Sequence, residues 1–161
     1  MREIIKLLEK DCRLTTEQIA KILKRDTAEV EKQIKEMEES GIIVKYKAII
    51  NWEKVDQNLM YALIEVKVTP QTDMGFERVA KRIYQFPEVH NMYLMSGGYD
   101  LAITIKGRAI HDIAKFVTEK LSVLDCVIST STHFVLKKYK DSGVVFSDGV
   151  TDGREVIPFE L

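Results

Sequence analysis

Residues 24–47 carry basic, amide and small side chains of the kinds that contact DNA. Lysine and arginine hold phosphates, while glutamine, lysine and methyl groups can read base edges in the major groove. The candidates for base contacts are Thr27, Ala28, Lys32 and Gln33. The candidates for phosphate contacts are Lys24, Arg25, Lys35, Lys45 and Lys47. These residue types favour recognition of double-stranded DNA, and the alternative for each lysine is an ordinary solvated surface charge.

Two short helices joined by a tight polar turn are predicted to position these side chains. Thr15 and Gln18 have the spacing of a capping box at the start of the first helix. Asp26 or Thr27 can cap the second helix, which ends at Gly41. Such a unit is shaped to lay its second helix in the major groove of DNA. The alternative is a plain helical hairpin with a charged, solvated face.

A turn in the second half of the chain is a candidate site for a small effector. Its members are Ser96, Gly97, Gly98, Tyr99 and Asp100. Adjacent glycines can present bare backbone N–H groups to a carboxylate, and an aspartate can accept hydrogen bonds from an ammonium group. An amino acid carries both groups, so the turn suits that class of ligand. The alternative is a hairpin turn whose glycines only meet a backbone requirement.

The residue pattern predicts no catalytic or metal site, and no cofactor. His90, His111 and His133 are widely spaced and form no paired metal-ligand motif. Cys12 and Cys126 form no CxxC motif, which favours a reduced, cytoplasmic protein. No apolar run approaches the roughly 20 residues that span a bilayer, and no basic leader with an apolar core opens the chain.

The charge balance predicts weak DNA binding by a single copy. The chain of 161 residues has a formal net charge of −1. Residues 1–50 carry a net charge of +1 and the remainder carries −2. Because affinity for DNA grows with the number of phosphates neutralised, binding would depend on several copies acting together.

Residues 1–50 are predicted to form the first domain, followed by a polar linker over residues 51–58. A first helix over residues 2–10 supplies apolar cover for the helical pair. Residues 42–50 alternate between lysines and apolar residues, the period of a half-buried strand. This strand is either the wing of a winged helix or a connector that pairs elsewhere.

Residues 59–140 predict a second domain with a ferredoxin-like βαββαβ order. The predicted elements are a strand at 59–68, a helix at 73–85, strands at 89–95 and 100–106, a helix at 109–124 and a strand at 127–138. The junctions FPEV and LDCV end at Val89 and Val127, 38 residues apart, which fits a duplicated half. Two helices on one sheet face would leave an apolar face uncovered, so we expect a two-fold dimer. Residues 141–161 are predicted to be a tail.

The order of these motifs resembles the Lrp/AsnC family of bacterial and archaeal regulators. The segment VEKQIKEMEESGII at 30–43 is similar to the recognition helix and its exit, and residues 44–59 are similar to the linking strand. FPEV, LDCV and the turn at 96–100 resemble features of the ligand-binding domain, and Thr130 and Thr132 resemble its last strand. The resemblance covers about residues 1–140.

This resemblance implies an α+β chain with a winged helix-turn-helix domain followed by a ferredoxin-like effector-binding domain. It implies a homodimer or octamer that binds DNA. It also implies that an amino acid binds at the subunit interfaces, where a neighbouring copy supplies Thr130 and Thr132. The recognition helix of the family often carries a pair of arginines. In this chain the corresponding positions are Lys32 and Gln33, and several glutamates surround them in the sequence. The alternatives are an effector-binding sensor with little DNA binding and an enzyme similar to siroheme decarboxylases.

Overall fold

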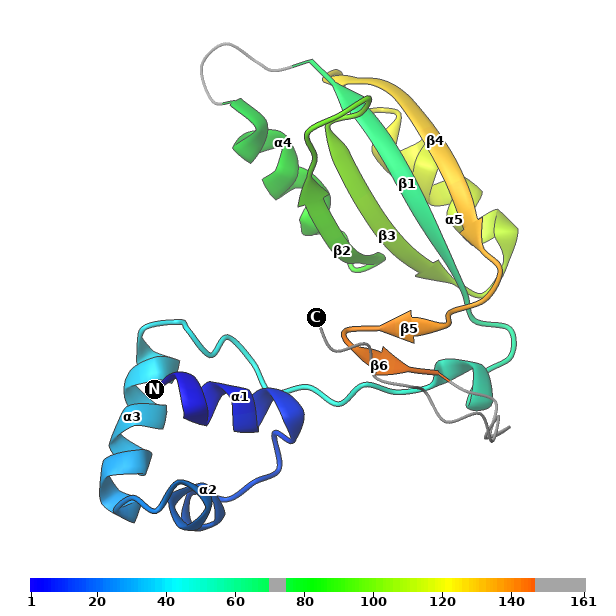
Figure 1. Cartoon of the computed structure of the whole chain (residues 1–161). Helices are drawn as coiled ribbons and strands as arrows, with labels where there is room; N and C mark the ends of the chain where they lie inside the picture. Colours follow the sequence, from blue (N-terminus) through cyan, green and yellow to red (C-terminus); the bar gives the residue numbers. More distant parts are fainter. Residues whose placement is uncertain (70–74, 147–161) are drawn as a thin grey trace, which may run out of the picture. The chain divides into compact units, whose positions relative to one another are not determined.

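The computed structural model describes residues 1–69 and 75–146, and the chain divides between Ile50 and Asn51 into two units (Figure 1). The first unit is helical, and the second combines an antiparallel sheet with helices. The predicted α+β class is therefore confirmed. Each unit has its own core of buried apolar side chains.

The first unit contains α1 (Arg2–Lys10), α2 (Thr16–Leu23) and α3 (Thr27–Glu39). Each helix contributes two buried residues, and those of α1 and α3 are spaced four and seven residues apart, as one face of a helix requires. These residues are Ile4, Leu8, Ile19, Ala20, Val30 and Met37. Their burial fixes which faces of α2 and α3 remain exposed.

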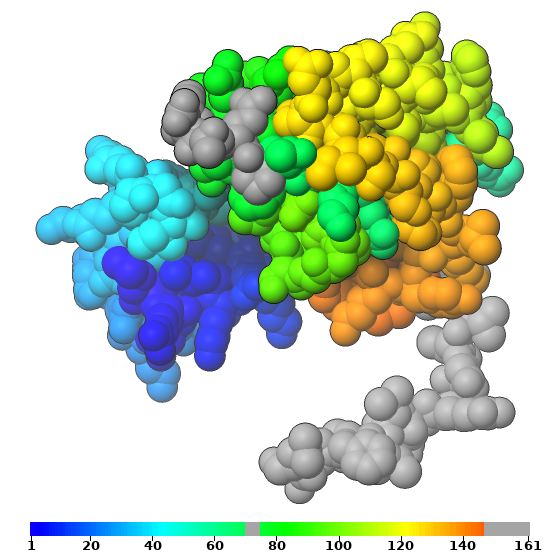
Figure 2. All heavy atoms as spheres, turned by 90° about the horizontal axis from the view of Figure 1, so that it is seen from above, coloured from blue at the N-terminus to red at the C-terminus, as the bar shows by residue number. Residues whose placement is uncertain are grey.

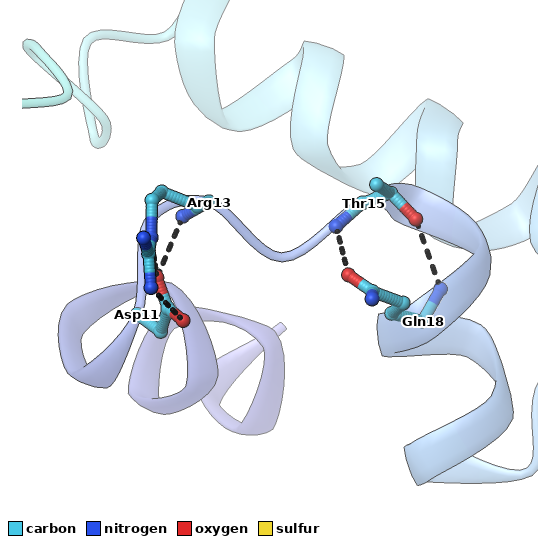
Figure 3. A network of polar contacts seen from close by, with 4 residues as sticks. All are labelled: Asp11, Arg13, Thr15 and Gln18. Atoms are coloured by element: carbon cyan, nitrogen blue, oxygen red, sulfur yellow. Dashed lines mark hydrogen bonds and ion pairs between the residues drawn. The ribbon is translucent and has the colours of Figure 1, made fainter.

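The predicted caps are present at the N-termini of both α2 and α3. The Thr15 hydroxyl accepts from the Gln18 N–H at 3.3 Å, and the Gln18 side chain accepts from the Thr15 N–H at 2.8 Å (Figure 3). Asp26, one of the two predicted candidates, caps α3 by accepting from the Glu29 N–H at 3.1 Å. A cap of this kind stabilises a helix by about 1 kcal/mol, so the boundaries of α2 and α3 follow from local sequence.

Residues 42–50 form no strand in the described chain, in contrast to the expected alternating strand. Val44 is 88% exposed, and Ile49 and Ile50 are each 45% exposed. A strand needs hydrogen bonds from a neighbouring strand, and the described first unit contains only helices as regular elements. The structure therefore favours a connector over a wing paired within this chain.

The second unit is built on four antiparallel strands in the spatial order β2-β3-β1-β4 (Figure 1). The strands are β1 (Met60–Val68), β2 (Val89–Leu94), β3 (Leu101–Gly107) and β4 (Val127–Val135). The helices are α4 (Gly75–Tyr84), α5 (Ile110–Phe116) and the π-helical turn η2 (Val117–Leu121), and a short 3-10 turn, η1 (Trp52–Lys54), precedes β1. The single helix expected over residues 109–124 is thus divided into α5 and η2.

Both helices of the βαββαβ order pack on one face of this sheet. Along β1 the buried residues are Ala62, Ile64, Val66 and Val68, and they share a core with Val79 and Ile83 of α4 and with Ile113 and Phe116 of α5. The opposite face is more polar than the sequence predicted. Its β1 residues are Tyr61, Leu63, Glu65 and Lys67, and β4 adds Ser129, Ser131 and His133 opposite them. The expectation of an apolar face was therefore wrong in part, because β4 contributes polar side chains there.

The two helix-to-strand junctions have the same backbone hydrogen bonds, 38 residues apart. In the first junction, the Val89 N–H donates to the Phe86 carbonyl at 3.0 Å. In the second, the Val127 N–H donates to the Leu124 carbonyl at 2.8 Å. The predicted duplication of the half is thus visible in the backbone.

Residues 140–145 form a hairpin where the sequence predicted the start of a tail. β5 (Lys140–Asp141) pairs with β6 (Val144–Val145), and the segment lies at the surface of the second unit (orange in Figure 2). Ser142 and Gly143 have φ values of 48° and 81°, as the central residues of a type I′ turn require. The serine-glycine pair was a sequence signal for this turn. Residues 147–161 of the predicted tail lie outside the described residues.

Candidate nucleic-acid interface and effector site

The outward face of α3 carries Ala28, Lys32 and Lys35. Val30 and Met37 are fully buried on the opposite side of the helix. The side chains of Lys32 and Lys35 are 78% and 72% exposed. Thr27, the first residue of α3, is half-buried, whereas Ala28 is exposed. The structure therefore presents three of the predicted DNA contacts on one accessible face.

Each of these lysines is paired with a glutamate one turn along α3. Lys32 Nζ lies 3.9 Å from Glu36 Oε1, and Lys35 Nζ lies 3.9 Å from Glu39 Oε1. Exposed pairs at this spacing contribute only about 0.3–0.5 kcal/mol. The lysines can therefore exchange these partners for phosphates at small cost, but the glutamates remain nearby.

Gln33 is held away from this face by two contacts that the sequence did not reveal. Its side-chain N–H donates to Glu29 Oε1 at 2.9 Å, and its oxygen accepts from the Met1 ammonium at 3.2 Å. Arg25 is also engaged, since its guanidinium donates to Glu3 Oε2 at 3.2 Å. The contacts of Gln33 with Met1 and of Arg25 with Glu3 join residues far apart in the sequence, so spacing alone could not identify them.

The exposed residues Lys45 and Lys47 flank Tyr46 in the segment after α3. The Tyr46 hydroxyl donates to Glu38 Oε1 at 2.9 Å. Burial, and then the hydrogen bond to the Glu38 carboxylate, raise the pKa of Tyr46 to about 12. The phenol is therefore protonated at neutral pH and ties the segment to α3. Lys24, another predicted phosphate contact, is exposed at the end of α2.

Asp100 has a structural task at the candidate effector turn. Its Oδ2 atom accepts from the Val68 N–H at 2.8 Å, and its own N–H donates to the Val66 carbonyl at 3.0 Å. The carboxylate is half-buried, while Ser96, Gly97 and Gly98 are exposed and Tyr99 is half-buried. Asp100 thus anchors the turn to the end of β1 with one oxygen.

The glycines of this turn are not required by the fold of the single chain. A Cβ atom on Gly97 or Gly98 would meet nothing within 4 Å, and neither residue has a positive φ. The alternative, that these glycines meet a backbone requirement, therefore finds no support in the described structure. Open space beside bare backbone suits the close approach of another molecule.

Thr130 and Thr132 are half-buried on β4. Thr130 is opposite Val66, and Val66 is also opposite Leu101, the residue after Asp100. Two strand spacings, about 10 Å, therefore separate Thr130 from the effector turn. The structure does not bring the threonines and the turn together within one chain.

A groove of about 420 Å³ lies between α4 and the edge strand β2. Its lining includes Phe76, Tyr84, Met92, Leu94 and Leu101. Leu94 and Leu101 end β2 and begin β3, so one end of the groove is lined by residues that flank the effector turn in the sequence. The sequence pattern does not indicate this groove, because the groove depends on how an amphipathic helix packs beside an unpaired strand edge.

Within residues 1–69 and 75–146, no three histidine, cysteine or acidic side chains are grouped so that they could hold a metal ion. None of the helices in the same ranges is long and apolar enough to cross a membrane.

Comparison with protein families identifies both units. Residues 1–44 match the family described as "Winged helix-turn-helix DNA-binding". Residues 61–145 match the family described as "Lrp/AsnC ligand binding domain". The chain belongs to the Lrp/AsnC family. This match confirms the predicted winged helix-turn-helix and Lrp/AsnC ligand-binding regions.

Relatives of this Lrp/AsnC chain are named as transcriptional regulators. The chain is 47% identical over 156 residues to the uncharacterized HTH-type transcriptional regulator YugG of Bacillus subtilis, covering 96% of this chain and 94% of YugG. It is 28% identical over 142 residues to the HTH-type transcriptional regulator FL11 of Pyrococcus furiosus, covering 88% of this chain and 90% of FL11. The predicted function, a DNA-binding transcriptional regulator of the Lrp/AsnC type, is thereby confirmed.

Solved structures share the fold of this Lrp/AsnC chain. A transcriptional regulator of Neisseria meningitidis, crystallised as a complex with L-methionine, superimposes with a TM-score of 0.72 at 24% identity, covering 86% of this chain and 89% of that one. Escherichia coli AsnC superimposes with a TM-score of 0.68 at 20% identity, covering 85% of this chain and 90% of the AsnC chain.

Proposed function

We propose that this chain binds double-stranded DNA through the outward face of α3, and that an amino acid held at the turn 96–100 controls the binding. The observation that carries the proposal is the exposure of Lys32 and Lys35 on the helix that a helix-turn-helix unit lays in the major groove. Lys24, Lys45 and Lys47 supply further phosphate contacts, and Ala28 approaches base edges. A regulator of this kind acts on chromosomal DNA, so we place it in the cytoplasm.

The effector part of the proposal rests on Gly97, Gly98 and Asp100. The glycines leave their backbone open to a carboxylate, and the second oxygen of Asp100 can accept from an ammonium group. The L-methionine complex of the Neisseria regulator supports an amino acid as the ligand. Thr130 and Thr132 would come from a neighbouring copy, since one chain keeps them apart from the turn.

Homo-oligomerisation, as a dimer or an octamer, is the remaining part of the proposal. The exposed apolar residues of 42–50 form a surface that a second copy would bury. The uncovered, partly polar face of the sheet is a second surface for such contact. Several copies would also multiply the DNA contacts of a chain whose formal net charge is −1. Ligand bound between copies would then alter DNA affinity by linkage.

The test is a fluorescence titration of the protein against DNA from its own upstream region at two salt concentrations. We expect affinity to fall with salt, and the Lys32→Ala/Lys35→Ala variant to bind less tightly with a smaller salt slope. Light scattering with and without a panel of amino acids tests the assembly. Ligand binding without any DNA shift would instead support the sensor with little DNA binding, which the five glutamates of α3 favour.

A further inference from the structure

Among the five glutamates of α3, Glu31 alone has a side chain without a hydrogen bond or ion pair to any described residue. The other four are engaged: Glu29 accepts from Gln33, and Glu38 accepts from Tyr46. Glu36 pairs with Lys32, and Glu39 pairs with Lys35. Glu31 is exposed, so its carboxylate is available to an incoming molecule.

The position of Glu31 places that carboxylate where a recognition helix reads bases. It is the fifth residue of α3, in the N-terminal half, and it lies one turn after Thr27 and beside Lys32. The N-terminal residues of a recognition helix are those that contact base edges in the major groove. If α3 enters the groove, as the proposed function requires, Glu31 enters with it.

A carboxylate in the major groove is repelled by the phosphates on both sides unless a base donates a hydrogen bond to it. Cytosine offers the N4 amino group as its only polar group in the major groove. The adenine amino group lies beside the N7 acceptor, which repels a carboxylate, while guanine and thymine present acceptors. A glutamate at this position therefore favours cytosine over the other three bases.

We propose that Glu31 is a specificity-determining residue that selects cytosine at one position of each DNA half-site. This inference rests on the proposed DNA binding through α3, and it adds a sequence preference that the lysines cannot supply, because phosphate contacts carry no sequence information. The free carboxylate then has a favourable role in a helix whose other glutamates weaken DNA binding.

Selection from a randomised DNA library tests the proposal with the full-length protein, followed by competition titrations on the selected site. We expect the wild type to enrich cytosine at one position of each half-site. Replacing that cytosine should weaken wild-type binding by roughly 5- to 150-fold. Glu31→Gln should lose this discrimination and shift the preference at that position towards adenine, since a glutamine amide pairs with adenine N6 and N7.

Glu39→Gln is the matched control, because it removes the same charge from the same helix near its C-terminal end. It should change affinity but keep the cytosine preference. Circular dichroism should show that both variants are folded, since glutamine is a good helix former. An unchanged cytosine preference in Glu31→Gln, or wild-type selection without a cytosine position, would overturn the proposal while leaving DNA binding intact. Failure of every variant to bind DNA would instead overturn the proposed function together with this inference.

Discussion

The Tyr46 hydroxyl and the Glu38 carboxylate are joined by a hydrogen bond of 2.9 Å, which ties the segment after α3 to the C-terminal half of that helix. The lysines on either side of Tyr46 are thereby held beside the proposed DNA-binding helix. We expect Tyr46→Phe to lower DNA affinity by about two- to twelve-fold, the upper limit being the full loss of one typical hydrogen bond of about 0.5–1.5 kcal/mol. Fluorescence titration checks the affinity, and an unchanged affinity would show that the segment does not need this anchor.

The same contact gives the first unit a defined pH dependence. The folded pKa of Tyr46, about 12, lies above its ordinary value of 10.0. A raised pKa means that the contribution to the free energy of unfolding is fully present below pH 10 and is lost as the pH rises towards 12. Urea unfolding should therefore show a difference between the wild type and Tyr46→Phe that shrinks over this interval. All other groups titrate alike in the wild type and the variant, so the difference in their free energies of unfolding reports on Tyr46 alone. A difference that stayed constant with pH would show that the pKa of Tyr46 is not raised by folding.

Removing the intrahelical partners of Lys32 and Lys35 should strengthen DNA binding. In Glu36→Gln/Glu39→Gln, both lysines lose a competing carboxylate and two negative charges leave the flank of α3. We expect higher affinity at low salt, with a gain that fades as salt rises. Each lost pair should reduce helix stability by only about 0.3–0.5 kcal/mol. Titrations at two salt concentrations check this, and weaker binding by the double variant would argue against α3 as the DNA-contacting helix.

The local parts of the fold could be predicted from the sequence because their causes are local. The Thr15–Gln18 capping box and the cap at Asp26 depend on spacings of three residues, and both are present. The βαββαβ order also follows from short-range periodicity. Residues 42–50 could not be predicted in the same way, because their alternation describes a strand whose partner is absent from the described unit.

The candidate site was less predictable because it depends on contacts between distant residues. Nothing in the spacing of Gln33 indicates that its oxygen accepts from the Met1 ammonium. The tie between Asp100 and Val68 likewise joins residues 32 positions apart. A residue type can thus suggest a role, but which of its atoms are already engaged is decided by tertiary structure.

Met37 is fully buried in the first unit, so its truncation should separate the two activities. We expect Met37→Ala to lower the stability of the helical unit by about 2–5 kcal/mol. DNA binding should be lost, while the second unit, whose core contains no residue of the first, should still bind the effector. Calorimetry with amino acids and a DNA titration on the same sample provide the check. Joint loss of both activities would show that the units do not fold independently.

Two substitutions at Asp100 can distinguish its structural task from effector binding. Asp100→Ala removes the acceptor for the Val68 N–H, and leaving that donor unpaired at a half-buried site should cost about 1–3 kcal/mol of stability. Asp100→Asn keeps an oxygen for the Val68 N–H but removes the negative charge that the ammonium group of an amino acid needs. We therefore expect the asparagine variant to remain nearly as stable as the wild type and to lose effector affinity, whereas the alanine variant loses both. Thermal unfolding and calorimetric titration measure the two quantities separately. If the asparagine variant bound the effector as tightly as the wild type, the charge of Asp100 would have no part in recognition, and its role would be confined to holding the turn against β1.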